Sequence, residues 1–156
     1  MSGGEPGLPV WMFRALGAGV GIAIMELLAA LAGEPLARVP FVTSIVLVMA
    51  LPSSETAGPR AIISGHLLST ACGFTCLWLI GPGEAASAAG VGLSTFCMIA
   101  FRAIHPPAGI GAFLVPLFHL SPSWLLNPVF AGALLLAVYD KLWQRAEQRL
   151  IASGVM

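Results

Sequence analysis

Charge is what this sequence has least of. Only 9% of its 156 residues are charged, and seven lysines and arginines balance seven aspartates and glutamates. Soluble domains usually carry about 25% charged residues, so a chain this poor in charge could not cover a soluble surface. The zero net charge also offers nothing to a nucleic-acid backbone, and we expect no nucleic-acid partner.

Cysteine is scarce as well, and its positions exclude the usual thiol sites. Cys72, Cys76 and Cys97 all lie in apolar segments and show neither metal-type C-x-x-C spacing nor a disulfide pattern. The basic stretch that opens a signal peptide is also missing, so we expect no cleaved leader. Residues 1–10 are polar and rich in glycine and proline, which predicts a flexible tail.

What the sequence does contain is long apolar runs. Hydrophobic residues make up 58% of the chain, and runs of about 20 of them predict transmembrane helices. The long runs cover roughly 11–32, 60–81, 86–104 and 123–143. Two shorter runs, 41–51 and 106–118, are opened by Pro40 and Pro106 respectively and are too short to cross about 30 Å of hydrocarbon. The sequence predicts an all-α integral membrane protein with about four full spans and two short, broken or re-entrant helices.

The order long, short, long occurs twice along the chain. This pattern suggests two inverted three-element halves, an arrangement that is found in transporters. We expect the transmembrane domain to cover 11–143 and a cytoplasmic tail helix to cover 144–156. The positive-inside rule favours a topology in which the short helices cross, and a re-entrant topology is the alternative. Both topologies place the two termini in the cytoplasm, and we expect a multi-pass protein of the inner cell membrane.

One polar stretch, Arg-Ala-Ile-His-Pro-Pro-Ala-Gly at 102–109, interrupts the second half. Proline lacks an N–H, so Pro106 and Pro107 fit the first turn of a new helix. The preceding helix is expected to stop near Ile104. A helix N-terminus presents unpaired N–H groups and a partial positive charge. The stretch therefore favours an anion site, and the alternative is a proline-marked turn between packed helices.

This stretch resembles the signature of the HPP family of small integral membrane proteins. A second block agrees with the resemblance, because Pro59-Arg60 is followed by Gly-His-Leu-Leu-Ser at 65–69. The resemblance implies a compact domain of four transmembrane helices that acts as a transporter. Plant chloroplast and cyanobacterial members are implicated in nitrite transport. The motif positions carried over are Arg60, Gly65, His66, Arg102, His105, Pro106, Pro107 and Gly109.

We therefore predict one polar site between the two halves, which binds a small monovalent anion, with nitrite as the first candidate. The predicted site residues are Arg60, His66, Arg102, His105, Pro106, Pro107, Gly109, Ser44 and Glu26. Glu26 is included because a carboxylate deep in a membrane helix usually faces a cavity or a partner. Ser44 lies in the first short run, where family members resemble Phe-Gly-Ala-Ser-Ala and this chain has bulkier neighbours. The histidines could couple a proton to the anion.

Two other functions compete with transport. The histidines His66, His105 and His119, with Glu26 or Asp140, could hold a metal and activate water. No H-E-x-x-H spacing supports such an enzyme, so we expect no enzyme, no metal and no cofactor. A non-transporting membrane assembly subunit is the other alternative.

The expected partners are the lipid bilayer and a small anion. An assembly of several copies could help a chain this short to enclose a path. Gly17 and Gly21 form a G-x-x-x-G pattern, which allows close helix contact within one chain or in a homo-oligomer.

Overall fold

The computed structural model describes residues 7–33 and 39–156, and the regular structure in these ranges is helical. The helices in chain order are α1 (Leu8–Ala32), α2 (Val39–Ala50), η1 (Glu55–Ala57), α3 (Pro59–Ile80), α4 (Glu84–Ala100), η2 (Pro106–Ala108), α5 (Gly109–Phe118), η3 (Pro122–Leu125), η4 (Leu126–Phe130) and α6 (Ala131–Ala152). The predicted all-α class is confirmed for the described residues.

Helix length separates the elements that can span a bilayer from those that cannot. Three helical stretches are long and apolar enough to cross, namely Leu8–Leu31, Pro59–Ile80 and Pro122–Ala152. The fourth expected span is α4, whose 17 residues reach only about 25 Å. The helices α2 and Pro106–Phe118 are short and apolar, as expected from their sequence.

The helix α4 ends earlier than the sequence predicts, at Ala100 instead of near Ile104. The cause is the backbone of Arg102, whose φ of 51° is left-handed and cannot continue a right-handed helix. The N–H of Ala103 closes this turn by donating to the carbonyl of Met98 at 2.9 Å. The chain therefore leaves α4 at Ala100, and residues 101–105 separate the helix from the two prolines.

Two predicted boundaries at the ends of the chain also shift. The helix α1 begins at Leu8, so residues 8–10 belong to it and not to the tail, because Pro9 is compatible with its first turn. Residues 1–6 of the predicted tail lie outside the described residues. The tail helix expected over 144–156 is continuous with α6, which runs from Ala131 to Ala152 without a break.

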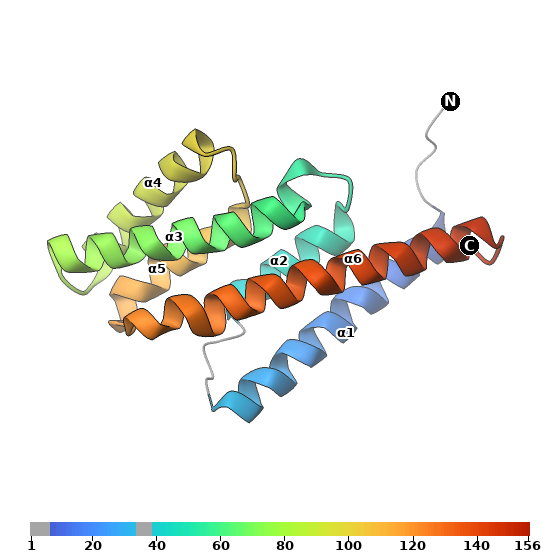
Figure 1. The fold of residues 1–156 in the computed structure, drawn as a ribbon, viewed down its shortest axis with the longest axis horizontal. Coiled ribbons are helices and arrows are strands. Elements are labelled where there is room, and N and C mark those ends of the chain that lie inside the picture. The colour runs from blue at the N-terminus through green and yellow to red at the C-terminus, as the bar shows by residue number, and fades with distance from the viewer. Residues whose placement is uncertain (1–6, 34–38) are drawn as a thin grey trace.

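The long helices α1, α3 and α6 run along the length of the molecule, α2 and α5 lie among them, and α4 lies at the edge beside α3 (Figure 1). α2 and α5 start near the middle and run toward opposite ends (Figure 1). α3 packs against α4, α5 and α6, and α6 packs in addition against α1 and α2. The start of α1 and the end of α6 lie at the same end of the molecule (Figure 1).

Two contacts fix the ends of α1 and α6 to each other. The Arg14 Nη2 atom lies 2.7 Å from Glu147 Oε1, and the Phe13 and Trp143 rings stack with their centroids 4.6 Å apart. A two-bond pair between a guanidinium and a carboxylate fixes orientation as well as distance. The beginning of α1 and the C-terminal part of α6 therefore lie at the same end of the molecule.

The glycine pair of α1 is used within the chain. A Cβ on Gly17 would lie 2.8 Å from Met49 Sδ, and one on Gly21 would lie 3.0 Å from the Tyr139 ring. These two positions thus let α2 and α6 approach α1 closely. A homo-oligomer would therefore need another surface.

Candidate functional site

Three polar side chains meet in the interior of the helical domain. Ser44, His66 and His105 are each 0% exposed. The Ser44 Oγ atom lies 3.0 Å from His66 Nε2 and 2.9 Å from His105 Nε2, and the two imidazole centroids are 5.2 Å apart. We call these residues the His–Ser–His cluster. It joins α2, α3 and the segment before η2, which are far apart in the sequence.

The sequence around His105 explains how the imidazole reaches this position. His105 precedes a proline and has φ −136° and ψ 90°, outside the α region that proline disfavours in its neighbour. On α3, Gly65 lacks a side chain where a Cβ would lie 2.7 Å from His105 Cβ. The prolines and Gly65 together place the His105 ring beside His66, one residue further along α3.

The hydrogen-bond partners assign the ring tautomers of the cluster. His105 Nδ1 lies 2.7 Å from the carbonyl oxygen of Thr56, which only accepts, so this nitrogen carries a hydrogen. In neutral His105 the other nitrogen then accepts the hydroxyl hydrogen of Ser44. The Ser44 oxygen can consequently accept from His66 Nε2–H. A second acceptor for the hydroxyl, the carbonyl oxygen of Pro40, lies 3.2 Å from Ser44 Oγ.

This assignment leaves His66 Nδ1 as a bare acceptor, and among the described residues it has no hydrogen-bond partner. The hydroxyl of Thr70, one turn further along the same face of α3, is also buried and unpaired there. Buried polar groups are nearly always hydrogen-bonded, to protein or to ordered water. His66 Nδ1 and the Thr70 hydroxyl are thus two unpaired polar groups on one face of α3 in the described structure.

Thr56 and Thr70 are not among the residues predicted from the sequence. Thr70 follows His66 by four residues, and this spacing was a signal that could have identified it. Thr56 acts through its backbone carbonyl, so no side-chain pattern pointed to it.

The motif residues after His105 line a different space. A pocket of about 760 Å³ lies between α2 and the start of η2 and α5. It is lined by Val39, Val42, Thr43, Leu47, Pro106, Pro107, Gly109 and Ile110. Pro106, Pro107 and Gly109 thus shape an apolar pocket next to the cluster and direct the chain that holds His105.

The two motif arginines do not enter the cluster. Arg60 and Arg102 are exposed, and each lines a surface pocket, of about 360 Å³ and 380 Å³ respectively. The Arg102 pocket also contains Glu55 and Thr56. Because the Thr56 carbonyl accepts from His105, this pocket is separated from the cluster by a single residue.

Glu26 lies exposed on α1 and is not part of the buried cluster. The carboxylate of Asp140 on α6 is buried, and Gln144 Nε2 lies 2.8 Å from each of its oxygens. His119 is exposed at the end of α5. Across 7–33 and 39–156, no group of three His, Cys, Asp or Glu side chains is arranged to hold a metal.

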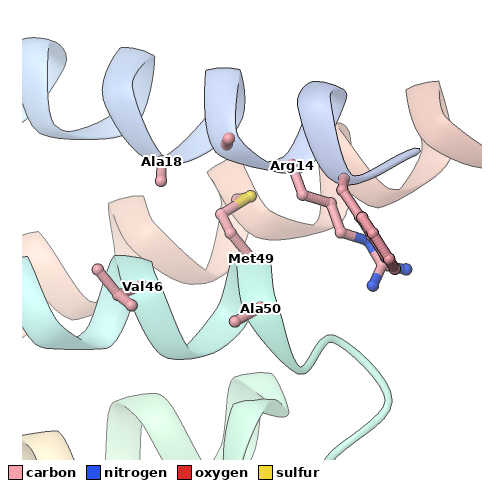
Figure 2. A pocket seen from close by; sticks show the side chains of 7 residues that line it. Arg14, Ala18, Val46, Met49 and Ala50 are labelled. Carbon is pink, nitrogen blue, oxygen red and sulfur yellow. The ribbon is translucent and has the colours of Figure 1, made fainter. Parts of the chain in front are cut away.

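A further pocket of about 520 Å³ lies between α1 and α2 (Figure 2). Its lining is mostly apolar and consists of Trp11, Arg14, Ala15, Ala18, Val46, Met49 and Ala50. Arg14 stands at one end of this pocket (Figure 2), and its guanidinium is bound to Glu147. None of the cluster residues lines this pocket, so it is a separate feature of the outer surface.

Comparison with known proteins gives two matches. The family model described as "HPP, transmembrane region" matches residues 4–151. A transmembrane protein of Dictyostelium discoideum is 30% identical over 105 residues, which cover 62% of this chain and 36% of that protein. This chain thus spans about a third of the length of that relative. No solved structure matches.

Proposed function

The chain belongs to the HPP transmembrane family, and on this premise we propose that it is a membrane transport protein for a small monovalent anion, with nitrite as the first candidate. The expected setting is the inner cell membrane, with both termini in the cytoplasm. The His–Ser–His cluster is the proposed centre of the transport path.

The single observation that carries this proposal is the complete burial of Ser44, His66 and His105 in a domain whose long helices are apolar. Ionisable side chains inside a membrane domain are costly and usually mark a substrate or ion path. Irregular backbone within the bilayer, such as the segment that holds His105, is tolerated only where protein or a cavity surrounds it.

The two short helices support an anion as the substrate. Ser44 lies in the second turn of α2, and His105 directly precedes η2 and α5. Short helices in transporters point their N-terminal ends at the anionic groups of substrates, because N-termini carry a partial positive charge. The last helix of each proposed half packs on the first two helices of the other half: α3 packs on α4 and α5, and α6 packs on α1 and α2. This reciprocal packing supports the proposed inverted halves.

The Arg102 pocket is the proposed entrance. An exposed guanidinium in a pocket raises the local concentration of an anion, and Thr56 connects this pocket to His105. The carboxylate of Glu55 in the same pocket weakens the attraction. Weak binding suits a transport path, because an ion that binds too tightly is not released.

The test is nitrite uptake by proteoliposomes that contain the purified chain, after subtraction of uptake by protein-free vesicles. We expect His105→Ala to abolish uptake and Arg102→Ala to reduce it severalfold, most strongly at low salt, because the arginine acts through a screened field. Arg149→Ala is the matched control, since Arg149 is also exposed but lies at the end of α6. Transport is excluded if the folded wild type carries none of nitrite, nitrate, formate and chloride.

A further inference from the structure

We propose that His66 Nδ1 takes up a proton together with the anion and that the Ser44 hydroxyl passes a proton on to His105. This inference rests on the proposed function and names the coupling ion of the same site. It makes the chain a symporter that moves one anion and one proton in a single cycle.

The His66 ring has one paired and one unpaired nitrogen. Its Nε2 faces Ser44 Oγ at 3.0 Å, and its Nδ1 has no partner among the described residues. The tautomer assigned from the Thr56 carbonyl makes this nitrogen a bare acceptor. An anion beside its lone pair would be repelled. A proton on Nδ1 turns the same atom into a charge-assisted donor.

An anion in the cluster could also be held by other charged groups near His66. The groups that contact His66 include Ser44 and the Phe41 ring from α2 and the His105 ring from the segment before η2. From α6, which also packs on α3, the buried carboxylate Asp140 is bound by Gln144.

Arginine does not fill this role either. Arg60 on the same helix and Arg102 after α4 are both exposed, and neither contacts the cluster. The positive charge that an anion needs inside the domain must therefore arrive as a proton.

The proton passes from His66 through the Ser44 hydroxyl to His105. A proton forms an N–H bond at His66 Nδ1, and the ring becomes an imidazolium. The His66 Nε2–H bond then breaks as its proton joins Ser44 Oγ, while the original Ser44 hydroxyl proton forms an N–H bond at His105 Nε2. The positive charge ends on His105. There it lies beside Thr56, which lines the Arg102 pocket.

The Ser44 hydroxyl has a hydrogen-bond acceptor both when His105 is neutral and when it is protonated. In the resting state the Ser44 hydroxyl points to His105 Nε2, 2.9 Å away. If His105 instead receives its proton from outside the cluster, both of its nitrogens donate and the hydroxyl can turn to the Pro40 carbonyl, 3.2 Å away. The serine therefore has an acceptor in either state.

The first experiment measures the tautomers directly, by ¹⁵N NMR of the full histidine-labelled chain in lipid nanodiscs at pH 7.5. We expect a bare Nδ1 on His66 and a bare Nε2 on His105, assigned through the signals lost in His66→Gln and His105→Asn. At lower pH, nitrite should convert His66 to the imidazolium. A hydrogen on His66 Nδ1 in the neutral ring would overturn the inference.

The second experiment measures flux in proteoliposomes that contain a pH dye, with the membrane potential clamped. We expect one proton to enter per nitrite and the rate to be the same at zero and at about 100 mV, because a co-transported proton cancels the charge that the potential would act on. In His66→Gln the amide can still donate to Ser44 but cannot titrate, and both fluxes should fall about a hundredfold. Ser44→Ala keeps both imidazoles and should slow both fluxes while His66 still takes up a proton by NMR.

The outcomes separate the two proposals. Nitrite flux that follows the potential, with no proton entry, overturns the proton inference and leaves the proposed function standing. Equal flux in His66→Gln and wild type does the same. Absence of any anion flux in the folded wild type overturns both.

Discussion

Gly65 of α3 lies directly against His105. A Cβ added to Gly65 would lie 2.7 Å from His105 Cβ and 3.2 Å from the carbonyl oxygen of Ala103. The His105 side chain cannot move away without losing hydrogen bonds, because Thr56 and Ser44 bind the two nitrogens of its ring. Gly65 therefore determines how closely the His105 segment approaches α3.

Gly65→Ala should destabilise the protein and stop transport. The added methyl group overpacks a site whose neighbours are fixed, and such changes cost about 1–3 kcal/mol. Thermal unfolding in detergent measures the loss. Gly92→Ala on α4 is the matched control, since a Cβ there meets nothing within 4 Å. If both variants melt at the same temperature, the contact with His105 is not what requires a glycine.

Thr70→Val should leave the stability of the protein unchanged or slightly raised. The Thr70 hydroxyl is buried without a partner in the described structure, so a methyl group of similar size removes an unpaired polar atom and no hydrogen bond. Ser69→Ala is the contrasting variant, because Ser69 Oγ accepts from the Ala112 N–H at 3.1 Å. We expect it to cost about 1 kcal/mol. A large loss of stability in Thr70→Val would show that the hydroxyl has a partner.

Gln144→Ala should destabilise the protein because it strips the buried Asp140 carboxylate of its donor. Leaving a buried polar group unpaired costs about 1–3 kcal/mol. The cost should be smaller when Asp140→Asn is already present, since an amide needs its partner less than a charge does. A double-mutant cycle of unfolding free energies measures this coupling. Equal costs in both backgrounds would mean that the two side chains are not coupled.

Cysteine reporters at Gly7 and Ser153 should react with an impermeant thiol reagent from the same side of the membrane. The reason is the pair formed by Arg14 and Glu147, at 2.7 Å. The measurement uses oriented vesicles and a chain whose native cysteines are replaced. Labelling from opposite sides would contradict the packing of α1 on α6.

The arginines of the motif occupy positions that their spacing in the sequence does not reveal. The pattern placed Arg60 and Arg102 in one polar site with the histidines, whereas the structure puts them in separate surface pockets. The left-handed backbone of Arg102 turns the chain before His105, so two residues only three positions apart face different surroundings. Local spacing does not reveal such a turn when the residue is not glycine.

The sequence by itself determined the helical membrane class and the two short helices led by proline. These follow from local causes, because hydrophobic run length and the missing proline N–H act within a few residues. Only the tertiary structure decided that Ser44 bridges the two imidazoles and that Thr56 fixes the tautomer. Those contacts join segments 22 to 61 residues apart, and helical periodicity determines which residues share a face but not which faces meet.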